Sequence, residues 1–358
     1  MMARADSNNF NPIRLFAAWL VLFSHSYHLS GLPYAEPLMR LTGNQMTFGT
    51  FAVGVFFAIS GYLITGSAYS RSTLWSFLDA RIRRIFPALI AVLLLSALVL
   101  GPLMTLLPLS DYFASSAVAT YVLRNAVLWR LQFELPGVFA ANPYGAAVNG
   151  SLWTLPIEFG LYLAVGAAVW LLRQLGQDAS RLLPSIAAAT ACLLAWGLLL
   201  SGRNSGLFLL LPYFMVGALC QLWRAQLPLH GGVALALGLL WAAVTALDLP
   251  GFAVVACLAI SYGSLWIGRH PRWILPFSTE RVGDLSYGVY LYAFPLQQTL
   301  TALGVATPGM LTLAATPLAL AFAWLSWHVV EERFLAPRRR GSHPVPAPSV
   351  APLQKAGS

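Results

Sequence analysis

Two ionisable side chains lie inside a long apolar stretch near the start of the chain, where a charge is costly. Arg14 and His25 are eleven residues apart in this stretch. In an α-helix this spacing brings them to within about 20° of one face, about 16 Å apart along the axis. His25 is therefore a candidate general base toward a hydroxyl, and the alternative is a neutral imidazole hydrogen-bonded to a neighbouring helix. His28, one turn farther on, is expected to meet headgroups or water.

Glu158 is a further ionisable residue in an apolar run, and it follows the segment 149–157. At the rise of an α-helix it lies about 10 Å below the start of its run, and His25 lies about 8 Å below the end of its own run. The sequence therefore predicts that the two side chains lie at similar depths. Because a carboxylate beside an imidazole can fix its tautomer and raise its basicity, we expect Glu158 to orient or polarise His25, directly or through water.

A charged group precedes a third apolar run and consists of Asp79, Arg81, Arg83 and Arg84. Arginines at the inner end of a membrane span are ordinary determinants of topology. The alternative is an anion site, because guanidinium groups form paired hydrogen bonds with phosphates. Arg81 and Arg84 are three residues apart, so they would share a helical face and could hold one phosphate group together.

These side chains need elements that can hold them in an apolar medium, and the composition indicates such elements. Of the 358 residues, 58% are hydrophobic and 9% are charged, which is far from the composition of soluble domains. The apolar runs are long enough to cross a bilayer, which takes about 20 helical residues. The chain is therefore expected to be an all-α integral membrane protein. About ten transmembrane helices are predicted, at residues 12–30, 48–68, 85–107, 151–172, 183–200, 206–223, 231–247, 251–268, 284–303 and 309–330.

The basic residues set the predicted orientation, because cytoplasmic loops are enriched in Lys and Arg. With the N-terminus inside, most of the 21 basic residues fall on the cytoplasmic side. The exceptions are Arg40, Arg124, Arg130 and Arg203. Counting residues 112–130 as an eleventh span would place the basic C-terminal tail outside, so that stretch is expected to be an interfacial helix. Both termini are predicted to be cytoplasmic, and the net charge of +9 indicates topology rather than a nucleic-acid partner.

The predicted spans form one membrane domain, residues 1–336, whose one long connection is the external loop 108–150. Residues 337–358 are rich in Pro, Ala, Ser and Arg and are expected to form a disordered cytoplasmic tail. The first apolar stretch is too long for a removable signal peptide and is expected to remain as a span. The three cysteines fall inside spans and are expected to pack as small apolar residues, so no metal site is predicted.

Small residues are concentrated in the second predicted span, between Gly49 and Gly61. Close packing of this helix against another is the simplest explanation, because small side chains allow two backbones to approach. The alternative is that the backbone approaches a ligand there.

Five motifs, taken in order, resemble the membrane-bound acyltransferase 3 family over nearly the whole chain, from about residue 9 to residue 337. The motifs run from Arg14 to His25 and over residues 54–61, 81–87, 151–158 and 285–295, with Glu332 after the last span. The resemblance implies ten spans. It also implies transfer of an acyl group, usually acetyl from acetyl-CoA, to a hydroxyl of a glycan or another large acceptor.

The same resemblance implies roles for single residues. His25 and Arg14 match the family's essential pair in the first span, and Glu158 matches its carboxylate in the fourth. Arg81 and Arg84 match its paired arginine motif. Many relatives carry a histidine in the ninth-span motif where this chain has Tyr292-Ala293-Phe294-Pro295. A mechanism that needs a second histidine there is therefore not expected.

The expected function is that of an acetyl-CoA-dependent O-acyltransferase of the bacterial inner membrane, acting on a surface or secreted carbohydrate that can be lipid-linked. Acetyl-CoA or another acyl-CoA is the expected donor, with its phosphates held from the cytoplasm by Arg81 and Arg84. The expected catalytic residues are His25, Glu158 and Arg14, and an acyl-histidine intermediate is an alternative route. The expected substrate-binding residues are Ser151, Trp153 and Tyr287. Tyr112 and Tyr144 are further candidates, with Trp153, for stacking on sugar rings, but an aromatic belt at the membrane interface is the simpler explanation of these three side chains.

A different class of protein would use the same residues. In a proton-coupled transporter or flippase for a lipid-linked or anionic solute, His25 and Glu158 would relay protons. A structural scaffold ranks below both, because it needs neither residue at a matching depth. Membrane lipids are the other expected partners, and the sequence does not predict an oligomeric state.

Overall fold

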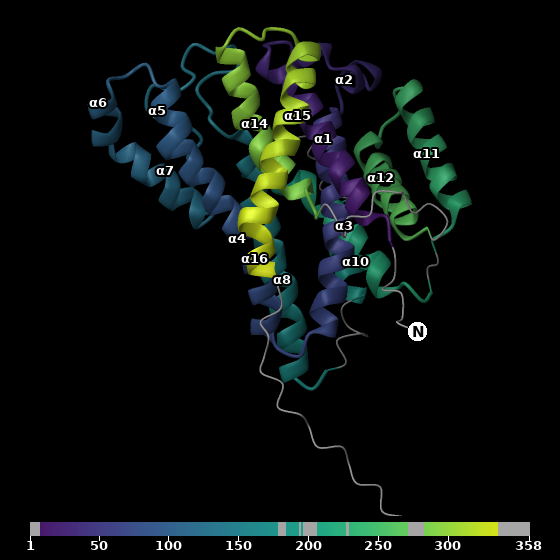
Figure 1. Cartoon of the computed structure of the whole chain (residues 1–358). Coiled ribbons are helices and arrows are strands. Elements are labelled where there is room, and N and C mark those ends of the chain that lie inside the picture. The colour runs from purple at the N-terminus through teal and green to yellow at the C-terminus, as the bar shows by residue number, and fades with distance from the viewer. Residues whose placement is uncertain are drawn as a thin grey trace, which may run out of the picture.

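The computed structural model describes residues 8–177, 184–192, 195, 206–226, 229–270 and 283–335. The regular elements in these residues are helices, and extended pairing among them is limited to two isolated β-bridges. Helices α3 (Phe48–Ser70), α14 (Ser286–Ala302) and α15 (Pro308–Ser326) pack around α1 (Phe10–Leu29). In Figure 1, α6 and α7 lie on one side of this central group and α11 and α12 lie on the other.

Ten further helices and several turns complete the elements of the described chain. The other helices are α2 (Pro37–Leu41), α4 (Leu74–Leu95), α5 (Gly101–Met104), α6 (Leu109–Ala114), α7 (Ser116–Ala126), α8 (Leu155–Gln174), α10 (Gly206–Leu222), α11 (Gly231–Ala246), α12 (Phe252–Arg269) and α16 (Glu332–Leu335). One π-helical turn, Ser96–Leu100, joins α4 to α5, and another, Trp327–Glu331, joins α15 to α16. The 3₁₀ turn Gly150–Thr154 leads into α8, and a second 3₁₀ turn, Pro33–Ala35, follows α1.

Five of the described helical segments are long and apolar enough to cross a membrane. They are Phe48–Ser70, Leu74–Met104, Gly150–Gln174, Phe252–Arg269 and Pro308–Leu335. A helix lies at each expected span. Of the expected span 183–200 the structure describes residues 184–192 and 195, which are helical, and the rest of that span lies outside the described residues. The all-helical membrane fold is thus confirmed, whereas the number of spans and the side of each terminus stay predictions.

The third expected span begins earlier than residue 85. Helix α4 begins at Leu74, because the Thr73 hydroxyl accepts a hydrogen bond of 3.1 Å from the backbone N–H of Ser76 and caps the helix. The charged residues 79–84 therefore lie inside α4 and not before it. A hydropathy profile finds the apolar part of a helix and misses helical turns before it that carry charged residues.

The stretch 112–130 forms no spanning helix. Helices α6 and α7 have 6 and 11 residues, so the longer is about 16 Å long against a hydrocarbon core of about 30 Å. Isolated bridges pair Thr105 with Val138 and Glu134 with Ala147. These bridges fold the long connection back on itself between α5 and α8.

Helices α3 and α10 approach closely through glycines. A Cβ atom on Gly61 of α3 would lie 2.0 Å from the backbone oxygen of Phe214 on α10. A Cβ atom on Gly217 of α10 would lie 2.0 Å from the backbone oxygen of Ala58. No larger side chain fits at either position without moving a backbone. The predicted close packing of the second span is therefore confirmed at Gly61.

Candidate active site

Three cavities lie between the helices that carry the candidate residues. The largest, of about 830 Å³, is lined by Arg14 of α1 and by Arg81 and Arg84 of α4. A narrow cavity of about 50 Å³ is lined by Glu158 and Tyr287, among others. A third cavity, of about 190 Å³, is lined by His25. We call them the Arg81 cavity, the narrow cavity and the His25 cavity.

Shared lining residues place the three cavities in a row. Arg14, Arg84 and Tyr162 line both the Arg81 cavity and the narrow cavity. Val53 and Tyr290 line both the narrow cavity and the His25 cavity. The row leads from the Arg81 cavity, which is lined by arginines, to the imidazole of His25. Because Arg14 and His25 both face it, their predicted shared helical face is confirmed.

His25 is partly buried among aromatic and small side chains. Its ring meets the ring of Phe294 edge-on, with 5.2 Å between centres, and its Nδ1 atom is buried without a hydrogen-bond partner among the described residues. His28 also lines the His25 cavity, but its Nδ1 lies 3.1 Å from the backbone oxygen of Ser24. Of these two histidines, His25 is therefore the one whose Nδ1 has no partner in the described part of the chain.

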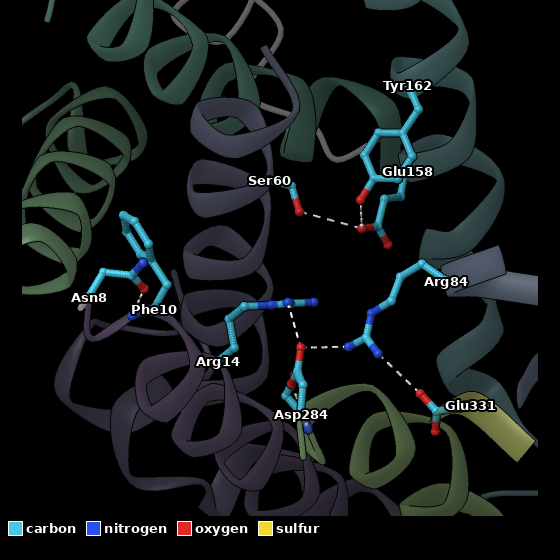
Figure 2. Close-up of polar contacts among 10 residues, drawn as sticks. Asn8, Phe10, Arg14, Ser60, Arg84, Glu158, Tyr162, Asp284 and Glu331 are labelled. Carbon is cyan, nitrogen blue, oxygen red and sulfur yellow. Dashed lines mark hydrogen bonds and ion pairs between the residues drawn. The ribbon is translucent and has the colours of Figure 1, made fainter. Parts of the chain in front are cut away.

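Glu158 lies in the narrow cavity and not beside His25. Its Oε1 atom accepts hydrogen bonds from the hydroxyls of Tyr162 and, at 3.4 Å, of Ser60 (Figure 2). Helix α3 packs against both α1 and α8, the helices of the two residues. The direct contact suggested by matching depths is therefore not formed. Depth along a helix does not determine which helices are neighbours.

A largely buried cluster of two arginines and two carboxylates borders the narrow cavity (Figure 2). Nη1 of Arg14 lies 3.0 Å from Oδ2 of Asp284, and Nη2 of Arg84 lies 2.6 Å from the same oxygen. Nη1 of Arg84 lies 3.2 Å from Oε2 of Glu331. Two positive and two negative charges compensate one another, which is what buried charges require. The cluster holds both arginines at the junction of two cavities.

The sequence analysis missed the two carboxylates of this cluster. Asp284 is the first residue of the ninth expected span, and its Oδ1 also accepts a hydrogen bond of 2.5 Å from the Ser286 hydroxyl. Glu331 is buried, whereas Glu332, which the motif comparison selected, is exposed. The available signal was an acidic residue at the end of an apolar run, where charge is costly. The sequence held no sign of which of two adjacent glutamates points inward.

Arg81 and Arg84 both line the Arg81 cavity but have different partners. Arg84 is held by two carboxylates, and its guanidinium lies over the rings of Tyr287 and Trp327. Arg81 donates to the Ser67 hydroxyl at 3.1 Å, and its buried Nε atom has no hydrogen-bond partner among the described residues. The two arginines predicted to hold one phosphate together thus differ: Arg84 is paired with two carboxylates, and Arg81 forms no ion pair with a described residue.

The predicted substrate-binding residues occupy different places. Trp153 lines the His25 cavity, and Tyr287 lines the narrow cavity with its hydroxyl donating to the backbone oxygen of Ile85 at 3.0 Å. Ser151 is buried, and its backbone oxygen accepts a hydrogen bond of 2.8 Å from Tyr290. Ser151 thus supports a cavity wall.

The two further aromatic candidates, Tyr144 and Tyr112, differ in their exposure. Tyr144 lines the His25 cavity and is half-exposed. Tyr112 is fully buried, and its hydroxyl donates to the backbone oxygen of Ala97 at 2.7 Å. The hypothesis that Tyr112 stacks on a sugar ring is therefore wrong, because its ring faces no open space.

Comparison with known proteins decides the class of this site. A family model described as an acyltransferase domain matches residues 8–328. The chain belongs to the acyltransferase 3 family. An O-acetyl transferase of Shigella phage Sf6 is 33% identical over 345 residues, covering 92% of this chain and 96% of the relative. Nodulation protein 10 of Rhizobium leguminosarum bv. viciae is 30% identical over 350 residues, covering 91% and 92%.

No solved structure matches the chain. Membership of the acyltransferase 3 family confirms the resemblance inferred from the motifs. Together with its apolar helices, it makes the protein a multi-pass membrane acyltransferase. The row of cavities is thus the candidate active site of this acyltransferase.

Proposed function

We propose that the protein transfers an acyl group, in the first instance acetyl, from cytoplasmic acyl-CoA to a hydroxyl of a surface or secreted carbohydrate. The transfer would take place within the bacterial inner membrane. The observation that carries the proposal is the row of three cavities between Arg81 and His25. A reaction that joins a donor and an acceptor from opposite sides needs such a row.

The donor would enter through the Arg81 cavity. At about 830 Å³ it is the largest of the three, as the nucleotide part of CoA requires. Arg81 is the best candidate for a CoA phosphate, because its buried Nε atom has no protein partner and guanidinium groups bind phosphates well. Arg14 and Arg84 would line the path of the thioester into the narrow cavity, with their charge balanced by Asp284 and Glu331.

The acceptor would enter the His25 cavity from the other end. An alcohol is a poor nucleophile near neutral pH, so a base must take its proton. His25 would take the hydroxyl proton while the hydroxyl oxygen attacks the thioester carbonyl. Collapse of the tetrahedral intermediate would break the carbon–sulfur bond, and the CoA thiolate would take the proton from His25. Free CoA and an ester of the acceptor are the products. An acyl-histidine intermediate is the alternative route.

Glu158 would act from the narrow cavity. Its hydrogen bonds to Tyr162 and Ser60 fix one wall of the thioester path. We assign it a positioning role there, and a water-mediated link to His25 is the alternative. A proton-coupled transporter or flippase remains the rival function, but acyltransferase family membership supports group transfer.

Sealed membrane vesicles test the proposal, because acetyl-CoA does not cross a bilayer unaided. Inside-out vesicles supplied with labelled acetyl-CoA should form labelled ester on the cell's own glycans, and right-side-out vesicles should not. The proposal fails if neither orientation forms ester. Movement of a lipid-linked glycan across the membrane without ester formation would establish the rival.

A further inference from the structure

The exposed edge of the His25 cavity is built from two distant parts of the chain. Phe294 of α14 meets the His25 ring edge-on at 5.2 Å and the Tyr144 ring edge-on at 5.8 Å between centres. Phe294 is 2% exposed, whereas Tyr144 is 48% exposed and lines the same cavity. Tyr144 is therefore the exposed member of a series of ring contacts that runs through Phe294 to His25, the candidate base.

Phe294 is fixed in this position by its surroundings. A Cβ atom on Gly150 would lie 2.6 Å from the Phe294 ring, so the ring packs directly over the backbone there. Leu29 and Leu311, both fully buried, form a small apolar cluster with Phe294. The contact from His25 through Phe294 to the exposed ring is thus a rigid arrangement.

The loop that carries the exposed ring is held by a buried amide. Gln298 lies one turn beyond Phe294 on α14 and is fully buried. Its Oε1 accepts from Asn142 Nδ2 at 2.8 Å, and its Nε2 donates to the backbone oxygens of Gly145 at 3.0 Å and Ala147 at 2.7 Å. Breaking these bonds would leave buried polar groups unpaired. Gln298 therefore fixes residues 142–147 over α14.

The turn inside this loop presents the Tyr144 ring. Gly145 has a φ of +103°, a conformation that other residues rarely adopt. Its backbone N–H donates to the backbone oxygen of Asn142 at 2.9 Å and closes the turn. The exposed ring is thus held on a tight, tethered turn and not on a free loop.

We propose that Tyr144 is a platform for a sugar ring of the acceptor, and that Gln298 is the positioning residue that holds this platform beside His25. The inference rests on the proposed function. A half-exposed aromatic face at the edge of a cavity suits the apolar face of a sugar ring. A sugar seated on Tyr144 would direct one of its hydroxyls into the cavity toward His25, and Trp153 would line the same cavity.

The test compares the O-acyl content of the host cell's own surface glycan, measured by mass spectrometry, at matched membrane levels of each variant. Tyr144→Ala should lower it by about tenfold, the loss of one good aromatic contact. Tyr144→Trp should retain it. The matched control is Tyr34→Ala, because Tyr34 is 72% exposed on the turn after α1 and has no part in the site.

A second readout separates the acceptor from the donor. In isolated membranes, Tyr144→Ala should leave the acetyl-CoA concentration for half-maximal transfer unchanged. Gln298→Leu should reproduce the loss of transfer and should also leave the acetyl-CoA dependence unchanged. If Gln298→Leu does not accumulate in the membrane, the Tyr144 variants alone test the proposal. Wild-type acylation by Tyr144→Ala, or a shifted donor dependence, would overturn the platform and leave the proposed function intact. If the wild-type protein forms no ester at all, the result contradicts the proposed acyl transfer itself and not only the role of Tyr144.

Discussion

Arg81 and Arg84 lie three positions apart on one helix, yet their surroundings differ and indicate different roles. Arg84 is held between Asp284 and Glu331, so its charge is already compensated. Arg81 forms no ion pair with any described residue and lines the largest of the three cavities, so its charge remains available for an anion. One motif thus contains a structural arginine and a candidate phosphate ligand.

The first prediction separates these two arginines. Arg81→Ala should raise the acetyl-CoA concentration for half-maximal transfer and leave thermal unfolding nearly unchanged. Arg84→Ala should destabilise the protein by about 3–5 kcal/mol, because it leaves the buried Glu331 carboxylate without its arginine and Asp284 with Arg14 alone. Enzyme assays in membranes and thermal unfolding in detergent measure the two effects. Equal effects of the two substitutions on both measurements would contradict the division.

Residue types and spacing predicted Arg14, His25 and Trp153 as members of the site, and the structure places all three on the row of cavities. Arg14 and His25 could be found because charges and histidines are rare in apolar runs. Asp284 and Glu331 could not be joined to the arginines, because they lie about 200 residues or more away along the chain. Contacts across such separations depend on which helices are neighbours.

At the scale of elements, α3 supports one side of the row, and its position depends on close packing against α10. Gly61 and Gly217 allow the backbones to meet, while Val53 and Ser60 on the same helix face cavities. Packing on one side of α3 therefore sets the width of the site on the other.

The second prediction concerns this packing. Gly61→Ala should destabilise the protein by about 1–3 kcal/mol or prevent its accumulation, because the new methyl group would meet the Phe214 backbone. Gly160→Ala is the matched control, since Gly160 also lies in a helix and has no neighbour within 4 Å of an added Cβ. Thermal unfolding of the purified variants measures both. An equally stable Gly61→Ala would show that α3 and α10 are not in close contact.

Hydropathy located the expected spans well for those elements that are apolar throughout. It failed at the start of α4, where a threonine cap begins the helix at Leu74 and the charged residues 79–84 follow the first turn. A capping residue is a local signal, and a window of mean hydropathy averages it away. The sequence alone also could not pair α3 with α10, because glycines predict close packing without naming the partner.

At the scale of the whole molecule, the row of cavities has a direction. The Arg81 cavity is lined by residues of the turn between α3 and α4, including Arg71 and Thr73. The His25 cavity is lined by Tyr144 and Gly150 of the long connection before α8. The charge pattern predicts the first region to be cytoplasmic and the second external.

The third prediction tests this direction with two exposed serines in a background without the three native cysteines. A membrane-impermeant thiol reagent added to intact cells should label Ser110→Cys, in the first turn of α6. It should label Ser72→Cys, between α3 and α4, only after the membrane is opened. Each variant serves as the control for the other. The reverse labelling pattern would show that the protein is inserted in the opposite orientation, with the Arg81 cavity on the side away from cytoplasmic acyl-CoA.

The central claim is that His25 takes the acceptor proton in acyl transfer, and His28 lines the same cavity as its natural control. The most direct measurement is the O-acyl content of the host's surface glycan, with His25→Ala and His28→Ala present at wild-type membrane levels. His25→Ala should lower transfer by about 100- to 10,000-fold, the usual cost of removing a general base. His28→Ala should retain most of the activity. Full acylation of the glycan by His25→Ala would remove this residue from the mechanism and contradict the account.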